Sequence, residues 1–169
     1  MDAIKNIIIE VEKLKSNQDF KGAISLLETG IQKYANDYRL YEEVADIYLY
    51  EAKFGKAMKA IEFALEINAW SATGNYLKGF ILLSQDKVKE SINFLEKSNK
   101  FMANNAEVLR NLGWAYTMVW ETNKGIIILK RALNLSPEDE LITEDLAMAL
   151  IGVGEVNEGH VLLQKIGKK

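Results

Sequence analysis

Apolar residues along the chain recur with the spacing of one helical face. Within residues 39–50 they include Leu40, Val44 and Ile47, three or four positions apart. No segment shows the strict alternation of apolar and polar residues that indicates a strand. The single proline, Pro137, leaves long stretches free to be helical. The pattern therefore predicts an all-α chain.

The helical pattern repeats every 34 residues along the whole chain without an insertion. A column of small residues is followed, four positions later, by a column of large apolar ones. The small column holds Ala23, Ala57, Ser91, Gly125 and Gly159, and the large column holds Leu27, Ile61, Leu95, Leu129 and Leu163. A second small column, in the preceding helix, holds Ala45, Gly79, Gly113 and Ala147. Small residues allow two helices to approach closely and large ones fill the remaining gaps, so each repeat is predicted to be a pair of packed helices.

Polar segments interrupt the helical pattern where the period requires a break, at 36–37, 68–71, 104–105 and 136–139. The last break predicts a helix start with Ser136 as N-cap and Pro137 at the first helical position. Helix pairs between the breaks define five repeats in one domain over residues 1–169. The repeat ranges are 3–35, 37–69, 71–103, 105–137 and 139–169.

The repeat resembles the tetratricopeptide repeat, a family of antiparallel helix pairs of 34 residues. The second and fourth repeats match best, through Tyr41, Val44, Ala45, Tyr48, Ala57 and Ala64, and through Leu109, Leu112, Gly113, Trp114, Tyr116, Ala132 and Pro137. The chain departs from the family pattern at Glu10, Asn75, Lys78, Thr143 and Ile166. The resemblance covers the whole chain and implies a right-handed α-solenoid of helix pairs.

Composition and charge exclude several functional classes. The net charge of −3 comes from 21 basic and 24 acidic residues spread along the chain, so nucleic acid is not an expected partner. The absence of cysteine excludes a disulfide framework and a thiolate metal site. No signal-peptide core is found, and no apolar run reaches the roughly 18 residues of a membrane span. A cytoplasmic protein without a membrane segment is therefore expected.

Catalytic chemistry has no convincing candidates in the sequence. The single histidine, His160, falls in an apolar column without a second histidine at metal-ligand spacing. Gly152 and Gly154 are interpreted as the turn of the fifth repeat, not as a phosphate-binding loop. The chain is therefore expected not to be an enzyme and to hold no cofactor or metal. Trp120 also occupies a turn, where packing under the adjoining loop is favoured over a second contact surface.

The resemblance implies a concave groove, lined by the first helix of each repeat, in which a peptide or helix of a partner protein lies. The expected groove residues are Arg39, Glu42, Asp46, Leu49, Tyr50, Tyr76, Phe80, Leu83, Arg110, Trp114, Met118 and Met148. Aromatic and methionine side chains among them, such as Trp114 and Met118, are typical anchors of a binding site. The alternative is that these side chains only pack against neighbouring first helices or are covered by the tight coil of the solenoid.

The charges in the expected groove limit its ligand. The family's carboxylate clamp, which holds the C-terminal tail of a chaperone with lysine and asparagine, is not matched, because its columns hold acidic and apolar residues. A hydrophobic or amphipathic segment with basic flanks facing Glu42, Glu43 and Asp46 fits better.

Two alternative functions remain open. The last repeat has no capping helix after it, so Leu163 and Ile166 are expected to face solvent. This favours a self-associating structural module that forms a homo-oligomer through its C-terminal helix. A small tetratricopeptide-type chaperone for secreted proteins is a variant of the binding function that is suggested by size alone. A helical enzyme domain or small-ligand sensor has no residue in its support.

Overall fold

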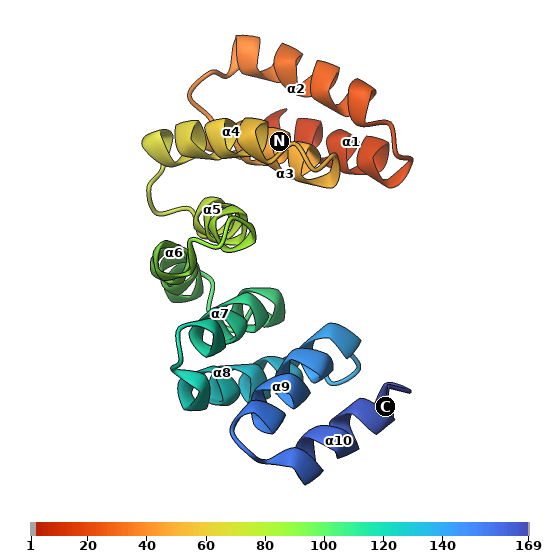
Figure 1. The fold of residues 1–169 in the computed structure, drawn as a ribbon. Helices are drawn as coiled ribbons and strands as arrows, with labels where there is room; N and C mark the ends of the chain where they lie inside the picture. The colour runs from red at the N-terminus through yellow and green to blue at the C-terminus, as the bar shows by residue number, and fades with distance from the viewer. Residues whose placement is uncertain (1–2, 169) are drawn as a thin grey trace. The chain divides into compact units, whose positions relative to one another are not determined.

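A computed structural model describes residues 3–168 as ten helices joined by short turns, without a strand (Figure 1). The helices are α1 (Ala3–Ser16), α2 (Phe20–Lys33), α3 (Tyr38–Tyr50), α4 (Phe54–Ile67), α5 (Ala72–Ser84), α6 (Val88–Phe101), α7 (Ala106–Met118), α8 (Thr122–Leu135), α9 (Glu140–Gly152) and α10 (Val156–Lys165). The predicted all-α class is confirmed. The helices form successive pairs, and each pair lies inside one of the predicted repeat ranges.

The turn inside each pair is closed by one residue in the left-handed region. These residues are Gln18, Ala52, Asp86, Trp120 and Gly154, with φ between 54° and 93°. The left-handed residue lets the next amide donate back to the first helix, as when Glu155 N donates to Leu150 O at 2.9 Å. Glycine adopts this conformation without strain, and only the fifth repeat has it.

The first helices of the later repeats begin at polar residues that are 34 positions apart. Each side chain accepts a hydrogen bond from an amide in the first turn, which otherwise has no partner within the helix. The capping residues are Asp37, Ser71, Asn105 and Asp139.

The start of α9 differs from the sequence prediction. The helix begins at Glu140 with Asp139 as its N-cap, and Asp139 Oδ1 accepts from Ile142 N at 3.0 Å. Ser136 instead ends α8, and Pro137 lies in the turn. The carboxylate of Asp139 can reach the first-turn amides, so the predicted cap at Ser136 is wrong by three positions.

Contacts divide the described chain into two compact units, unit 1 ending at Ile81 and unit 2 beginning at Leu82, within α5. Unit 1 has one apolar cluster around Val11 and Leu27, and another around Ile61, all fully buried. The first lies between α1, α2 and α3, and the second between α3, α4 and α5. The single domain expected over residues 1–169 stays a prediction.

The core of unit 2 shows why small residues recur in its helices. Leu129 of α8 is fully buried beside Leu146 and Leu150 of α9. A Cβ atom added to Gly125 would lie only 2.6 Å from the carbonyl oxygen of Gly113. The predicted close approach of α7 and α8 is therefore confirmed, since no larger side chain fits at this contact without a shift.

The last helix, α10, buries more than the sequence suggested. Leu163 is only 8% exposed and Ile166 is half-buried. The expectation that Leu163 faces solvent is wrong, because α10 packs along α9 and turns this side chain inward. The exposed apolar residues of α10 are Val156 and Val161 instead.

Candidate functional site

The predicted site residues of α3 begin with Arg39, in the first helical turn. Its Nε donates to Asp37 Oδ1 at 2.9 Å and its Nη2 to Asp37 Oδ2 at 2.7 Å. Such two-pronged pairs hold a guanidinium in a defined orientation. Arg39 is half-buried and is therefore held against the start of its own helix.

Glu42 does not face solvent, contrary to the expected groove surface. Its side chain is buried, and it accepts a hydrogen bond from the hydroxyl of Ser71, the residue that caps α5. Burial raises the pKa of Glu42 to about 7, although the bonds from Ser71 and the Gly74 amide oppose the rise. Glu42 thus links α3 to the start of α5, which covers this part of α3.

Asp46 belongs to a cluster around Lys15 of α1. The Nζ atom of Lys15 lies 2.5 Å from Asp46 Oδ2, 2.7 Å from Glu12 Oε1 and 3.1 Å from Glu43 Oε2. Burial lowers the pKa of Lys15, but the bonds to Asp46 and Glu12 and the charge of Glu43 outweigh it, so the pKa is raised. Burial also raises the pKa of Glu43, against the effect of Lys15.

The acidic flank predicted to face a basic partner is therefore occupied from within the chain. Lys15 neutralises Glu43 and Asp46, and Glu42 is buried. Sequence spacing placed these carboxylates on the first-helix surface, but it could not predict that a lysine of the preceding repeat reaches them.

The apolar site residues of unit 1 differ in their surroundings. Leu49 is half-buried against the core of α3 and α4. Tyr50 is 66% exposed and stacks on Phe20, with ring centroids 5.8 Å apart. Tyr76 and Phe80 of α5 are half-buried neighbours, with ring centroids 6.4 Å apart. Unit 1 thus brings Tyr76 and Phe80 together, and Leu49 and Tyr76 pack against the same apolar cluster.

The site residues of unit 2 lie mainly on α7. Leu83, at the end of α5, is half-buried. Arg110, Trp114 and Met118 are spaced four residues apart, so they share one face of α7. Trp114 is half-buried and Met118 is 40% exposed.

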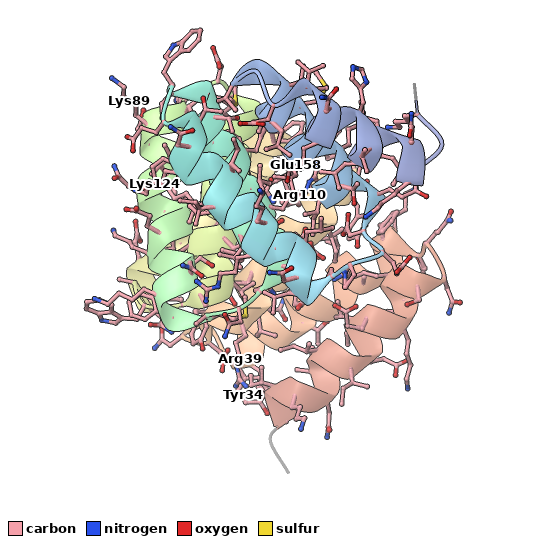
Figure 2. All side chains as sticks on the ribbon, turned by 90° about the horizontal axis from the view of Figure 1, so that it is seen from below. Tyr34, Arg39, Lys89, Arg110, Lys124 and Glu158 are labelled. Atoms are coloured by element: carbon pink, nitrogen blue, oxygen red, sulfur yellow. The ribbon has the colours of Figure 1, made fainter. Side chains whose placement is uncertain are left out.

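An ion pair joins α7 to α9 beside this face. Arg110, labelled in Figure 2, donates from Nε to Asp145 Oδ2 at 2.6 Å. Burial raises the pKa of Asp145, although the bond from Arg110 lowers it. The sequence prediction missed Asp145, whose only signal was its opposite charge, 35 residues after Arg110.

Apolar side chains lie on either side of the ion pair. Short turns reverse the chain before and after α8, so α7 and α9 run in the same direction. One turn after the pair, Trp114 lies on the same face of α7 as Arg110, and Met148, which is 51% exposed, lies on the same face of α9 as Asp145. Leu141, one turn before the pair on α9, is 54% exposed. We refer to Trp114, Met118, Leu141 and Met148 as the α7–α9 strip.

Two tryptophans outside the predicted site are exposed. Trp120 is 92% exposed at the turn between α7 and α8, and Trp70 is 70% exposed at the turn before α5. The expectation that Trp120 packs under a loop is wrong. Its left-handed backbone, with φ of 67°, places it in the turn, where the helices do not cover it.

The part of the chain that the structure describes offers neither a metal-binding cluster nor a membrane-spanning helix. Within residues 3–168, no group of three or more histidine or acidic residues has the arrangement needed to hold a metal ion. In the same part of the chain, every helix is too short or too polar to traverse a lipid bilayer.

Comparison with known proteins connects the chain to solved structures. No family model matches the chain, and no curated protein matches its sequence. MamA from Desulfovibrio magneticus RS-1 is 18% identical, with a TM-score of 0.80 over 98% of this chain and 94% of that one. PilW, a widely conserved type IV pilus biogenesis factor, is 20% identical, with a TM-score of 0.86 over 98% of this chain and 77% of that one.

A third similar structure is itself described as a tetratricopeptide protein. YrrB, a tetratricopeptide protein with an unusual peptide-binding site, is 13% identical, with a TM-score of 0.74 over 94% of this chain and 82% of that one. What these proteins share with the chain is the fold. The predicted tetratricopeptide architecture of paired helices is therefore confirmed.

Proposed function

We propose that the chain is a protein-interaction module without enzymatic activity, and that the α7–α9 strip binds a segment of a partner protein. The observation that carries this proposal is the exposure of Met118, Leu141 and Met148, with a half-buried Trp114, on the two helices that the Arg110–Asp145 pair joins. Exposed apolar side chains gathered on one surface are typical of interaction sites. Tryptophan supplies a rigid anchor and methionine adapts to the shape of its ligand.

The chemistry of the strip favours an amphipathic helix as its ligand. Arg110 and Asp145 neutralise each other, so the partner needs no charge at this point. The eight steps from Arg110 to Met118 rise about 12 Å along α7, or about two turns of a bound helix. A ligand with apolar residues at positions i, i+3 or i+4 and i+7 therefore matches the strip in length and character.

The fold supports this class of function by analogy. The description of YrrB names a peptide-binding site on the same fold. The spread of acidic and basic residues argues against nucleic acid, and the cysteine-free sequence fits the cytoplasm as the site of action. These two points are part of the proposal.

The test compares strip variants with a matched tryptophan variant outside the strip. Helical peptides are first selected for binding to the wild-type chain from a displayed amphipathic library, and affinities are then measured by calorimetry. Trp114→Ala and Met148→Asp are each expected to weaken binding about 30-fold, or ~2 kcal/mol. Trp70→Ala, which removes an exposed indole from unit 1, is expected to leave affinity unchanged.

Folding is measured separately by circular dichroism and urea unfolding. Met148 is half-exposed, so Met148→Asp is expected to fold normally. The proposed site can therefore be tested with Met148→Asp even if Trp114→Ala is unstable. Equal affinity of the wild-type chain and Met148→Asp for the selected peptides would disprove the proposed site.

Self-association is a second candidate function, favoured by Val156 and Val161 of α10. These side chains are 42% and 54% exposed on the helix that ends the last repeat. A weight-average mass that rises with concentration in light scattering, and that Val161→Asp returns to the monomer value, is the expected result. A strict monomer at high micromolar concentration excludes this candidate.

A further inference from the structure

Three adjoining hollows lie on unit 1, away from the α7–α9 strip. Their volumes are about 550, 430 and 260 Å³, and Lys56 of α4 lines all of them. The first lies at the turn between α3 and α4, the second along α3 and α4, and the third between α2 and that turn. The hollows therefore form one uneven surface that is centred on Lys56.

The second hollow has an apolar wall. Tyr41, Tyr48, Ala60 and Phe63 line it together with two lysines. The rings of Tyr41 and Phe63 lie 4.6 Å apart in a tilted arrangement, and Phe63 is 45% exposed. Aromatic faces that are paired with each other and open to solvent suit an aliphatic or aromatic side chain of a ligand.

The same surface carries unbalanced positive charge. Lys53 is the N-cap of α4, and Lys56 and Lys59 follow it at intervals of three in the first turns of the helix, so the three lysines are close in sequence and lie on neighbouring turns. Lys53 pairs with Glu51 at 2.9 Å, whereas Lys56 and Lys59 form no ion pair with any residue that the structure describes. Lys56 instead lies over the ring of Tyr48, with Nζ 5.4 Å from the centroid.

The local charge contrasts with that of the whole chain. Four lysines and two glutamates line the three hollows, whereas the chain has a net charge of −3. A ligand that contacts this surface gains most if it brings carboxylates, because these would lie beside lysines that have no carboxylate of their own.

We propose that this lysine–aromatic surface, formed by Tyr41, Tyr48, Lys56, Lys59 and Phe63, binds an extended protein segment in which acidic and large apolar residues alternate. Successive side chains of an extended segment point to opposite sides. A segment that lies edge-on between the two helices would pack its apolar row on Tyr41 and Tyr48 of α3 and direct its acidic row toward Lys56 and Lys59 of α4.

The dimensions of α4 set the length of the bound segment. The ten steps from Lys53 to Phe63 rise about 15 Å, which an extended peptide covers with about four or five residues. The surface lies on α3 and α4 of unit 1 and shares no residue with the α7–α9 strip of unit 2, so this inference goes beyond the proposed function and does not depend on it.

The experiment titrates the full chain with an octapeptide of alternating glutamate and leucine, by calorimetry. The double variant Lys56→Glu and Lys59→Glu is expected to weaken binding at least about tenfold. The matched control is Lys97→Glu and Lys100→Glu, two exposed lysines of α6 with the same spacing and the same change in net charge. This control is expected to retain at least half of the wild-type affinity.

Two variant peptides separate the contribution of charge to binding from that of apolar contact. The Trp114→Ala variant separates this surface from the α7–α9 strip. An octapeptide with glutamine in place of glutamate, and one with alanine in place of leucine, are each expected to bind at least about tenfold more weakly. The Trp114→Ala variant is expected to bind the acidic octapeptide as the wild type does, so failure of the α7–α9 strip would not affect this result.

Three results would overturn the proposal. The first is no detectable binding of the acidic octapeptide at millimolar concentration. The second is an equal loss of affinity in the two double variants, which would indicate bulk charge alone. The third is tighter binding of a uridine octamer that Lys56→Glu and Lys59→Glu abolish, which would assign the surface to RNA.

Discussion

Buried carboxyl groups in this chain take part in contacts between repeats. Glu42 of α3 accepts from Ser71, which in turn caps α5 by accepting from the Gly74 amide. A Cβ atom on Gly74 would lie 2.9 Å from Glu42 Oε1, so glycine makes room for the carboxyl group. Burial without a cation favours the neutral form, which explains why the pKa of Glu42 rises.

The raised pKa of Glu42 predicts a pH-dependent stability. The pKa of Glu42 is about 7 in the folded chain, and its ordinary value is 4.5. Between these two pH values the folded chain therefore binds more protons than the unfolded chain. The free energy of unfolding should therefore fall as pH rises from about 4.5 to about 7, by up to about 3 kcal/mol from this group. Glu42→Gln keeps an acceptor for Ser71 but does not titrate, so its stability should depend less on pH.

Urea unfolding of the wild type and Glu42→Gln at several pH values measures this effect. Burial also raises the pKa values of Glu43 and Asp145, but both groups remain in the variant, so the difference between the two profiles belongs to Glu42. Parallel profiles from pH 4.5 to 8 would contradict the prediction.

Individual contacts of this kind could not be predicted from the sequence. Spacing correctly identifies Arg110, Trp114 and Met118 as sharing a face, because the helical period fixes directions. It does not predict that Lys15 reaches Asp46 or that Asp145 reaches Arg110, since these pairs join different repeats whose side chains are not the same.

At the level of the helices, the close contact between α7 and α8 depends on the absence of side chains. Gly113 and Gly125 face each other, and a Cβ atom on Gly125 would also lie 2.7 Å from Thr117 Cγ2. The backbone carbonyl of Gly113 cannot move aside without shifting its helix. The size of the residue at position 125 therefore controls how well this pair packs.

Gly125→Ala is expected to lower the free energy of unfolding by about 1–2 kcal/mol, because the cost of overpacking exceeds the gain in helix propensity. Gly55→Ala is the matched control, since no atom lies within 4 Å of the Cβ position there. It should leave stability unchanged or raise it by up to about 1 kcal/mol. Denaturant unfolding of both variants is the measurement, and equal stability of the two would refute the steric argument.

Helix positions were predictable because the period of 34 places the same types of residue in the same surroundings. The caps Asp37, Ser71, Asn105 and Asp139 form such a column. The wrong start of α9 came from weighing the local signals of Ser136 and Pro137 above this column. The periodic signal is the better guide here, because a cap must face the same turn in each repeat.

At the level of the whole chain, each unit has its own core. Val11 and Ile61 are fully buried in unit 1, and Leu129 is fully buried in unit 2. In arrays of repeats, the free energy of unfolding is roughly the sum of the stabilities of the single repeats and of the contacts between neighbouring repeats. A destabilising substitution therefore need not affect all repeats equally. We expect the destabilising effect of a core substitution to become smaller beyond the boundary between the units, which lies inside α5.

Leu129→Ala should destabilise the chain around it by about 2–5 kcal/mol, because it leaves a cavity in a fully buried position. Amide hydrogen exchange is expected to accelerate strongly in α7 to α10 and little in α1 and α2. Ile61→Ala in unit 1 is the reciprocal variant, with the opposite pattern expected. Uniform acceleration along the chain in both variants would indicate a single cooperative unit.

Because Trp120 is exposed, it can be replaced without disturbing the core, and the fluorescence of a remaining tryptophan can then report ligand binding. Trp120 and Trp70 lie largely in water, whereas Trp114 is half-buried in the α7–α9 strip. Replacing the two exposed indoles with phenylalanine would leave Trp114 as the sole source of tryptophan fluorescence. A shift of its emission to shorter wavelength would then report, without any attached dye, the moment at which a ligand displaces water from that side chain.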